Sequence, residues 1–144
     1  MDINDIGKLW AEDSKIDITE LGEASLSIPK LHHKYYMIYI KERAKYILME
    51  NKLKKLKFEK RIFYIEGPNE ETKKLGWNFP PKGAILKTDV QLYLDADPDI
   101  SDATIKLFWQ QEIVDYLKDI IKTISFRNQS ISNALSDLKF KNGS

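Results

Sequence analysis

A basic run at Lys52–Arg61, KLKKLKFEKR, holds the residues of this chain that are best suited to chemistry. Most of its members are Lys or Arg, Glu59 is its one acid, and the aromatic residues Phe58, Phe63 and Tyr64 lie in or beside it. Lys and Arg neutralise phosphates and release counterions, and aromatic faces stack bases. The run therefore favours a nucleic acid partner, and the alternative is a solvated helix face. No base-reading arrangement is visible, so we expect weak sequence preference.

Two adjacent histidines, His32 and His33 in the segment LHHKYY, are poorly placed to hold one metal ion. Neighbouring side chains on a helix point about 100° apart, whereas a ligand pair needs a spacing such as i, i+4. We therefore expect these histidines to lie in a core or an interface.

The acidic segment DADPD at Asp95–Asp99 imitates the start of a calcium-binding loop. Ile100 stands where such a loop needs Gly, and Lys106 stands where it needs Glu, so we exclude a calcium site. These acids are instead expected to form a turn and to begin a helix, with Asp99 or Ser101 as the capping residue.

Motifs for catalysis are missing from the sequence. It contains no Cys, which excludes disulfides, thiolate metal sites and Cys nucleophiles. It also contains no Walker loop and no GxGxxG, GxSxG or HExxH motif. We therefore expect a protein that is not an enzyme and that binds no metal and no cofactor.

Charge is distributed unevenly along a chain whose formal net charge is only +1. Residues 30–61 carry 11 basic and 3 acidic residues, a net charge of +8. Residues 1–29 are net −5, residues 62–102 are net −4 and residues 103–144 are net +2. This asymmetry indicates a polyanionic partner that the charge of the whole chain conceals.

The length of 144 residues and a hydrophobic content of 42% fit one domain with its own core, at 1–144. No apolar run is long enough for a membrane helix, and the acidic N-terminus lacks signal-peptide character. We therefore expect a soluble, cytosolic protein that does not contact a membrane.

The predicted fold class is mainly α, with two long helices and a middle segment rich in Gly and Pro. The first long helix begins near Ser27 and continues to Gly67, because no Gly or Pro interrupts it after Pro29. Residues 85–94 could form a strand or a short helix. The expected segments are an acidic N-terminal segment at 1–26 with a short helix at Ile3–Ala11 anchored by Trp10, a basic long helix at 27–66, loops and short elements at 67–100, and a C-terminal long helix at 101–138.

The first long helix carries two apolar stripes at helical periodicity. We favour the interpretation that one stripe packs within the chain and the other packs against another subunit; the alternative is one thick intrachain core. The first stripe consists of Met37, Ile40, Ala44, Ile47, Phe58, Ile62 and Ile65, and the second consists of Leu31, Tyr35, Ile38, Leu53, Leu56 and Phe63.

The second long helix carries an apolar seam with alternating spacings of four and three, broken only at Arg127. Such a seam is typical of a helical bundle or of an oligomer, and one sequence does not distinguish these. The predicted oligomer-contact residues along this helix are Ile113, Leu117, Ile120, Ile124, Ile131, Leu135 and Leu138, and Ala134 lies in register with the seam.

Several stretches combine into one specific pattern. They are SLSIPKLHHKYY at Ser25–Tyr36, FYIEGP at Phe63–Pro68, LGWNFPPKGAILKTDVQLYLDAD at Leu75–Asp97, and QQEIVDYLKDIIKTISFRNQSISNAL at Gln110–Leu135. Together they cover nearly the whole chain from about Ile16, and they resemble the UvsY-type recombination mediators of T-even-like phages.

The resemblance implies a small, largely helical protein that forms a ring-like homo-oligomer, a hexamer or a heptamer, and binds single-stranded DNA. It implies that the protein helps to load a RecA-like phage recombinase onto strands covered by the phage single-stranded-DNA-binding protein. Homologous recombination and repair in the cytoplasm of the infected bacterial host would then be its setting.

The resemblance also indicates DNA-binding positions. The family's basic pair lies just before the tyrosine-rich end of the first long helix, which is the location of Lys60 and Arg61 here. In one register the pair falls on Arg61 and Glu59, with Lys57 or Lys60 as the substitute. From the basic segment and the resemblance together, the expected DNA-binding residues are Lys41, Arg43, Lys45, Lys52, Lys54, Lys55, Lys57, Lys60, Arg61 and Tyr64.

Two other classes of protein remain open at this point. A helical oligomeric adaptor with a merely solvated basic face would show no salt-dependent DNA binding. An architectural protein of duplex DNA or RNA would show no preference for single strands.

Overall fold

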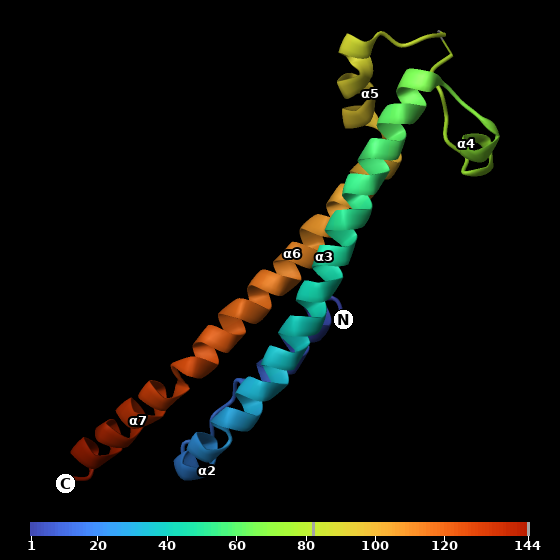
Figure 1. The fold of residues 1–144 in the computed structure, drawn as a ribbon. Coiled ribbons are helices and arrows are strands. Elements are labelled where there is room, and N and C mark those ends of the chain that lie inside the picture. Colours follow the sequence, from blue (N-terminus) through green and yellow to red (C-terminus); the bar gives the residue numbers. More distant parts are fainter. Residues whose placement is uncertain (82, 144) are drawn as a thin grey trace. The chain divides into compact units, whose positions relative to one another are not determined.

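The computed structural model describes residues 1–81 and 83–143, and every regular element within them is helical (Figure 1). This confirms the predicted mainly α class, and it resolves the open choice at 85–94 in favour of helix. The elements in chain order are α1 (Ile3–Asp13), α2 (Leu21–Leu26), α3 (Ile28–Glu66), α4 (Glu70–Lys74), the 3₁₀ turn η1 (Lys87–Asp89), α5 (Val90–Ala96), α6 (Pro98–Ser125) and α7 (Arg127–Lys141).

Helix α3 agrees with its predicted boundaries to within one residue. Pro29 lies in its first turn, where a missing backbone N–H costs nothing. Gly67 ends it: the backbone there turns to a φ of +86°, a conformation that favours Gly, and its N–H donates to the Phe63 carbonyl at 2.9 Å. One uninterrupted helix therefore carries the whole basic run.

The second long helix differs from its prediction at both ends and in the middle. It begins at Pro98, and the capping residue is Asp97, whose carboxylate accepts the backbone N–H groups of Asp99 and Ile100 at 2.9 and 3.1 Å. Neither Asp99 nor Ser101 is the cap. The helix breaks at Phe126, which has φ −89° and ψ 0°, and it resumes as α7.

The break at Phe126 is explained by the residue that follows it. The Arg127 guanidinium donates to the backbone carbonyls of Asp13 at 3.1 Å and Lys15 at 3.0 Å, at the end of α1. Carbonyls at a helix C-terminus lack helical partners, so a buried cation there satisfies them. The residue that interrupts the apolar seam thus directly follows the break between α6 and α7.

The described residues form two compact units, and each has its own core. The first unit comprises 1–46 and 109–144. The core of its described part combines α1, α3 and α6, and contains Ile6, Tyr35, Ile113, Leu117, Ile120 and Ile124. In this unit α3 and α6 run in opposite directions, since Glu42 accepts the Gln110 amide at 2.7 Å whereas the earlier Tyr35 packs with the later Leu117.

The core of the first unit contains most of the predicted oligomer seam. Five of its seven residues are at most 6% exposed within the chain: Ile113, Leu117, Ile120, Ile124 and Ile131. Seam spacing of this kind suits an intrachain bundle equally well, which is why the pattern did not separate the two cases. Of the remaining two, Leu135 is exposed and Leu138 is half-buried.

Trp10 anchors α1 as expected, and its ring meets Tyr35 edge-on at 5.4 Å between centroids. The Tyr35 hydroxyl and the Lys34 ammonium both donate to the Asp13 carboxylate, at 2.8 and 2.6 Å. Burial by itself raises the pKa of Asp13, but these two hydrogen bonds and the nearby cations hold it below its usual value. The N-terminal helix is thereby tied to α3.

The second unit comprises 47–108 and contains the basic run. Its core joins the later part of α3 to α5 and to the start of α6 through Leu53, Phe63, Tyr64, Val90, Leu94 and Ile100. Phe63 lies at the centre of an aromatic group, with Trp77 and Phe79 edge-on at 5.5 and 5.6 Å. The Gly- and Pro-rich middle segment therefore contributes rings to this core.

The two apolar stripes of α3 differ in burial. The second stripe is buried or half-buried at every position, whereas the first stripe is exposed at every position. The exposed fractions of its large side chains run from 37% at Ile62 to 63% at Phe58. One stripe thus packs within the chain, and the other presents apolar surface that the chain does not cover.

None of the helices in residues 1–81 and 83–143 has both the length and the apolarity needed to cross a membrane.

Candidate nucleic-acid interface

Eight of the ten predicted DNA-binding residues have exposed side chains on α3. Solvent exposure is the minimum that a phosphate contact requires, because a long cationic side chain must reach a strand outside the chain. The eight are Lys41, Arg43, Lys45, Lys52, Lys54, Lys55, Lys57 and Arg61, and we call them the α3 cations.

Two of the α3 cations form ion pairs within the helix. Lys54 lies 3.1 Å from Glu50, and Lys55 lies 3.7 Å from Glu59, both at i, i+4 spacing. Exposed pairs of this kind are worth about 0.3–0.5 kcal/mol, so a phosphate can displace the carboxylate at little cost. The acids therefore reduce the positive charge that α3 presents to solvent only slightly.

Lys60 differs from the eight α3 cations, because its side chain is buried and only 2% of the residue is exposed. Its ammonium lies 3.1 Å from Asp97 and 2.8 Å from Asp99, and 4.1 Å from the centroid of the Trp77 ring. A cation that is buried, paired and covered by an aromatic ring does not reach a DNA backbone. Of the pair that the resemblance indicated, only Arg61 faces solvent.

Tyr64, the last of the ten predicted DNA-binding residues, is also buried and is 5% exposed. Its hydroxyl donates to the Asp97 carboxylate at 2.6 Å. Burial, together with that hydrogen bond and the carboxylate charge, raises the pKa of Tyr64 above its usual value. The ring belongs to the core of the second unit and does not offer a face to a base.

Asp97 contacts both Lys60 and Tyr64 in this buried group. Burial alone raises the pKa of its carboxyl, but hydrogen bonds from Tyr64, the Ile100 N–H and Lys60 outweigh it and hold the pKa below the ordinary value. The segment DADPD therefore does more than form a turn at the surface, because Asp97 is buried among these partners. It holds α3 against the start of α6.

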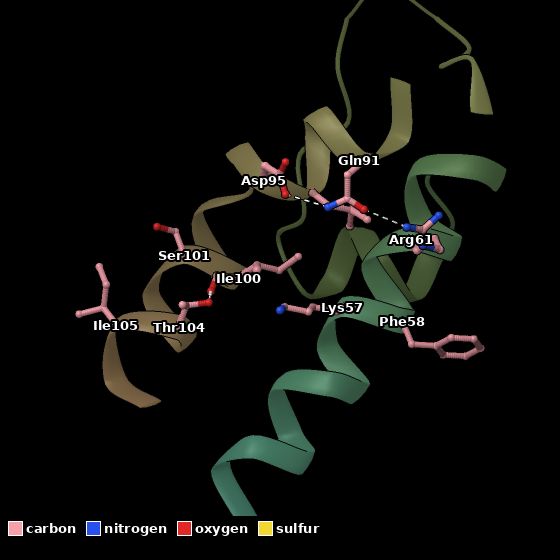
Figure 2. A pocket seen from close by; sticks show the side chains of 10 residues that line it. Lys57, Phe58, Arg61, Gln91, Asp95, Ile100, Ser101, Thr104 and Ile105 are labelled. Atoms are coloured by element: carbon pink, nitrogen blue, oxygen red, sulfur yellow. Dashed lines mark hydrogen bonds between the residues drawn. The ribbon is translucent and has the colours of Figure 1, made fainter. Parts of the chain in front are cut away.

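Beside the α3 cations lies an open hollow of about 450 Å³ within the second unit (Figure 2). Arg61 donates to the Gln91 side-chain oxygen at 3.0 Å, and the Gln91 amide donates to Asp95 at 2.7 Å. The sequence did not point to the α5 and α6 residues of this hollow as part of a binding site. Its lining consists of Lys57, Phe58, Arg61, Gln91, Leu94, Asp95, Ile100, Ser101, Thr104 and Ile105.

The two histidines have separate surroundings. His32 stacks on Tyr36 with 5.9 Å between ring centroids, one turn apart on α3, and His33 is exposed. In the part of the chain that the structure describes, no group of three or more His, Asp or Glu side chains is placed to hold a metal ion.

Comparison with known proteins identifies one family. The family model described as "Recombination, repair and ssDNA binding protein UvsY" matches residues 9–144. No curated protein sequence matches the chain.

Solved structures share the fold. A crystal structure of the bacteriophage T4 recombination mediator protein UvsY, lattice type II, has a TM-score of 0.77 at 19% identity, over 100% of this chain and 99% of that chain. A second crystal form of the same protein, lattice type IV, has a TM-score of 0.78 at 16% identity, over 98% of this chain and 99% of that chain. At these identities the likeness concerns the fold alone.

Proposed function

The chain belongs to the UvsY family of recombination, repair and single-stranded-DNA-binding proteins, and on that premise we propose that it is a recombination mediator that binds single-stranded DNA through the α3 cations. Its role is to help load a RecA-like phage recombinase onto strands covered by single-stranded-DNA-binding protein. It acts in homologous recombination and repair, in the cytoplasm of the infected host.

The observation that carries this proposal is the exposure of all eight α3 cations along one uninterrupted helix. The rest of the chain is net acidic, so the field that attracts a polyanion is concentrated on this element. Each phosphate that a Lys or Arg neutralises releases counterions, which supplies affinity without reading the base sequence. That is the property a mediator needs to act on any strand.

Assembly is the second part of the proposal. The exposed stripe of α3 leaves large apolar side chains such as Ile40, Ile47 and Phe58 in contact with water. Large apolar side chains left exposed along one helix mark an interaction site, and we assign them to contacts with further copies of the chain, arranged in a ring. Repeating a modest set of cations around an oligomer raises affinity through effective concentration.

The test of this function is a loading assay. A RecA-like recombinase is mixed with single-stranded DNA that is saturated with single-stranded-DNA-binding protein, with and without the chain, and the rate of filament formation is followed. Faster filament formation supports the proposal. If the chain binds naked strands yet leaves the rate unchanged on covered strands, it binds DNA but is not a mediator.

The adaptor alternative makes a separate prediction in the same assay. An adaptor would assemble through the exposed stripe of α3 and would bind neither naked nor covered strands at any salt concentration. Single-strand binding by an assembled protein therefore excludes it.

A further inference from the structure

The hollow beside Lys57 and Arg61 has two chemically different sides (Figure 2). The α3 side is cationic, and in Figure 2 the Lys57 side chain extends toward α6 while the Phe58 ring points away. Leu94 and Ile100, which are 6% and 7% exposed, supply buried apolar side chains. A volume of about 450 Å³ lies within the range of sites that take small molecules.

The side of the hollow formed by α5 and α6 carries polar side chains that are held in place by hydrogen bonds. Gln91 uses its oxygen for Arg61 and its amide for Asp95, so all three side chains are held in one chain of hydrogen bonds. The Thr104 hydroxyl donates to the Ile100 carbonyl at 2.7 Å, which fixes its position on α6. The Asp95 carboxylate repels phosphates, and its second oxygen is available to a hydrogen-bond donor.

The hollow is cationic on its α3 side and carries a carboxylate on its far side, and this arrangement suits one kind of ligand. We propose that the hollow receives one unstacked nucleobase of a single strand, while Lys57 and Arg61 hold the phosphates on either side of it; this rests on the proposed function. The base lies over Leu94 and Ile100, and Asp95 accepts one of its N–H groups. Every base carries such a donor on its pairing edge, so the contact does not select a sequence.

A base site in this hollow accounts for a preference for single strands over duplexes, which the α3 cations alone do not provide. Phosphates are present on duplexes and single strands alike, whereas only a single strand can place a base in the hollow at no cost in unpairing. Discrimination against duplex DNA then comes from the hollow, and salt dependence comes from the cations.

The experiment compares two labelled oligonucleotides of equal length and equal phosphate number, one with ordinary bases and one made of abasic sites. The protein is the full chain, and fluorescence anisotropy is read at several salt concentrations. The double variant Ser101→Leu/Thr104→Leu fills the hollow without changing any charge. The matched control, Ser101→Ala/Thr104→Val, alters the same positions without filling it, and light scattering checks that all three proteins have the same mass.

We expect the wild type to bind the ordinary strand on the order of tenfold more tightly than the abasic strand. The filling variant should lose that difference, with unchanged affinity for the abasic strand and an unchanged salt slope, and the control should keep it. Equal, salt-dependent binding of both strands by the wild type overturns the base site and leaves the proposed function standing. Binding of neither strand overturns both. An equal loss on both strands in the filling variant also contradicts the base site.

Discussion

The Lys60 ammonium lies 3.1 Å from the Asp97 carboxylate, and the two side chains are only 3% and 1% exposed. The next residue on α3, Arg61, is exposed and borders the hollow. Two adjacent cations in one basic run therefore have different tasks. Lys60 holds the second unit together, and Arg61 is available to a partner.

This division predicts that two similar substitutions on α3 differ greatly in their effect on stability. Lys60→Ala leaves the Asp97 carboxylate buried without its cation, which should cost about 3–5 kcal/mol of unfolding free energy. Lys57→Ala removes an exposed cation and should change stability by less than about 0.5 kcal/mol. Urea unfolding of both variants measures this. Equal stability of the two would show that the buried pair does not hold the unit.

Acid should weaken the second unit through Asp97. Its pKa is lowered on folding from an ordinary 3.8, so its contribution to stability is fully present above that pH and is lost as the pH falls through the lowered value. Melting temperature followed from pH 7 downward should decline in this range. Asp97→Asn should have a lower melting temperature at pH 7 and a flatter decline in acid; a decline as steep as that of the wild type would assign it to other groups.

Much of the fold was predictable from the sequence, and the features that were not predicted have physical causes. The ends of α3 were predictable because Pro29 and Gly67 act through local backbone geometry. The break at Phe126 was not, because it depends on Arg127 reaching carbonyls at the end of α1, more than 100 residues away in the chain. No local pattern encodes such a contact.

The candidate site shows the same limit. Composition and periodicity identified the basic helix, and eight of its ten assigned residues are exposed. Periodicity did not reveal that Lys60 and Tyr64 face inward, because their partner Asp97 is more than 30 residues further along the chain. The α5 and α6 sides of the hollow were not predicted, since no binding motif includes Gln91 or Thr104.

Single α3 cations should change the salt dependence of DNA binding. Lys57→Ala should weaken single-strand binding and lower the slope of log affinity against log salt by about 0.7, the value for one lost phosphate contact. Anisotropy titrations at four or more salt concentrations measure the slope. A weaker affinity with an unchanged slope would mean that Lys57 does not contact a phosphate.

The exposed stripe of α3 should control assembly. Met37→Glu/Ile40→Glu places charges on side chains that are 40% and 44% exposed, so folding should be retained while contact with another copy is lost. Light scattering should report a lower mass with an unchanged helical circular dichroism spectrum. The control is Lys41→Glu, a charge change on the same helix outside the stripe. A mass equal to that of the wild type would remove this stripe from the interface.

The central claim is that the α3 cations bind single-stranded DNA, and a charge-reversal titration tests it most directly. Wild type, Lys54→Glu/Lys57→Glu/Arg61→Glu and the control Lys73→Glu/Lys74→Glu/Lys87→Glu are titrated against a labelled single strand and a labelled duplex across a salt series. The control has the same net charge as the first variant, and its three positions are exposed. We predict tight, salt-dependent binding with a single-strand preference in the wild type and control, and its loss in the α3 variant. Equal binding by the two variants, or salt-independent binding by the wild type, would contradict the claim.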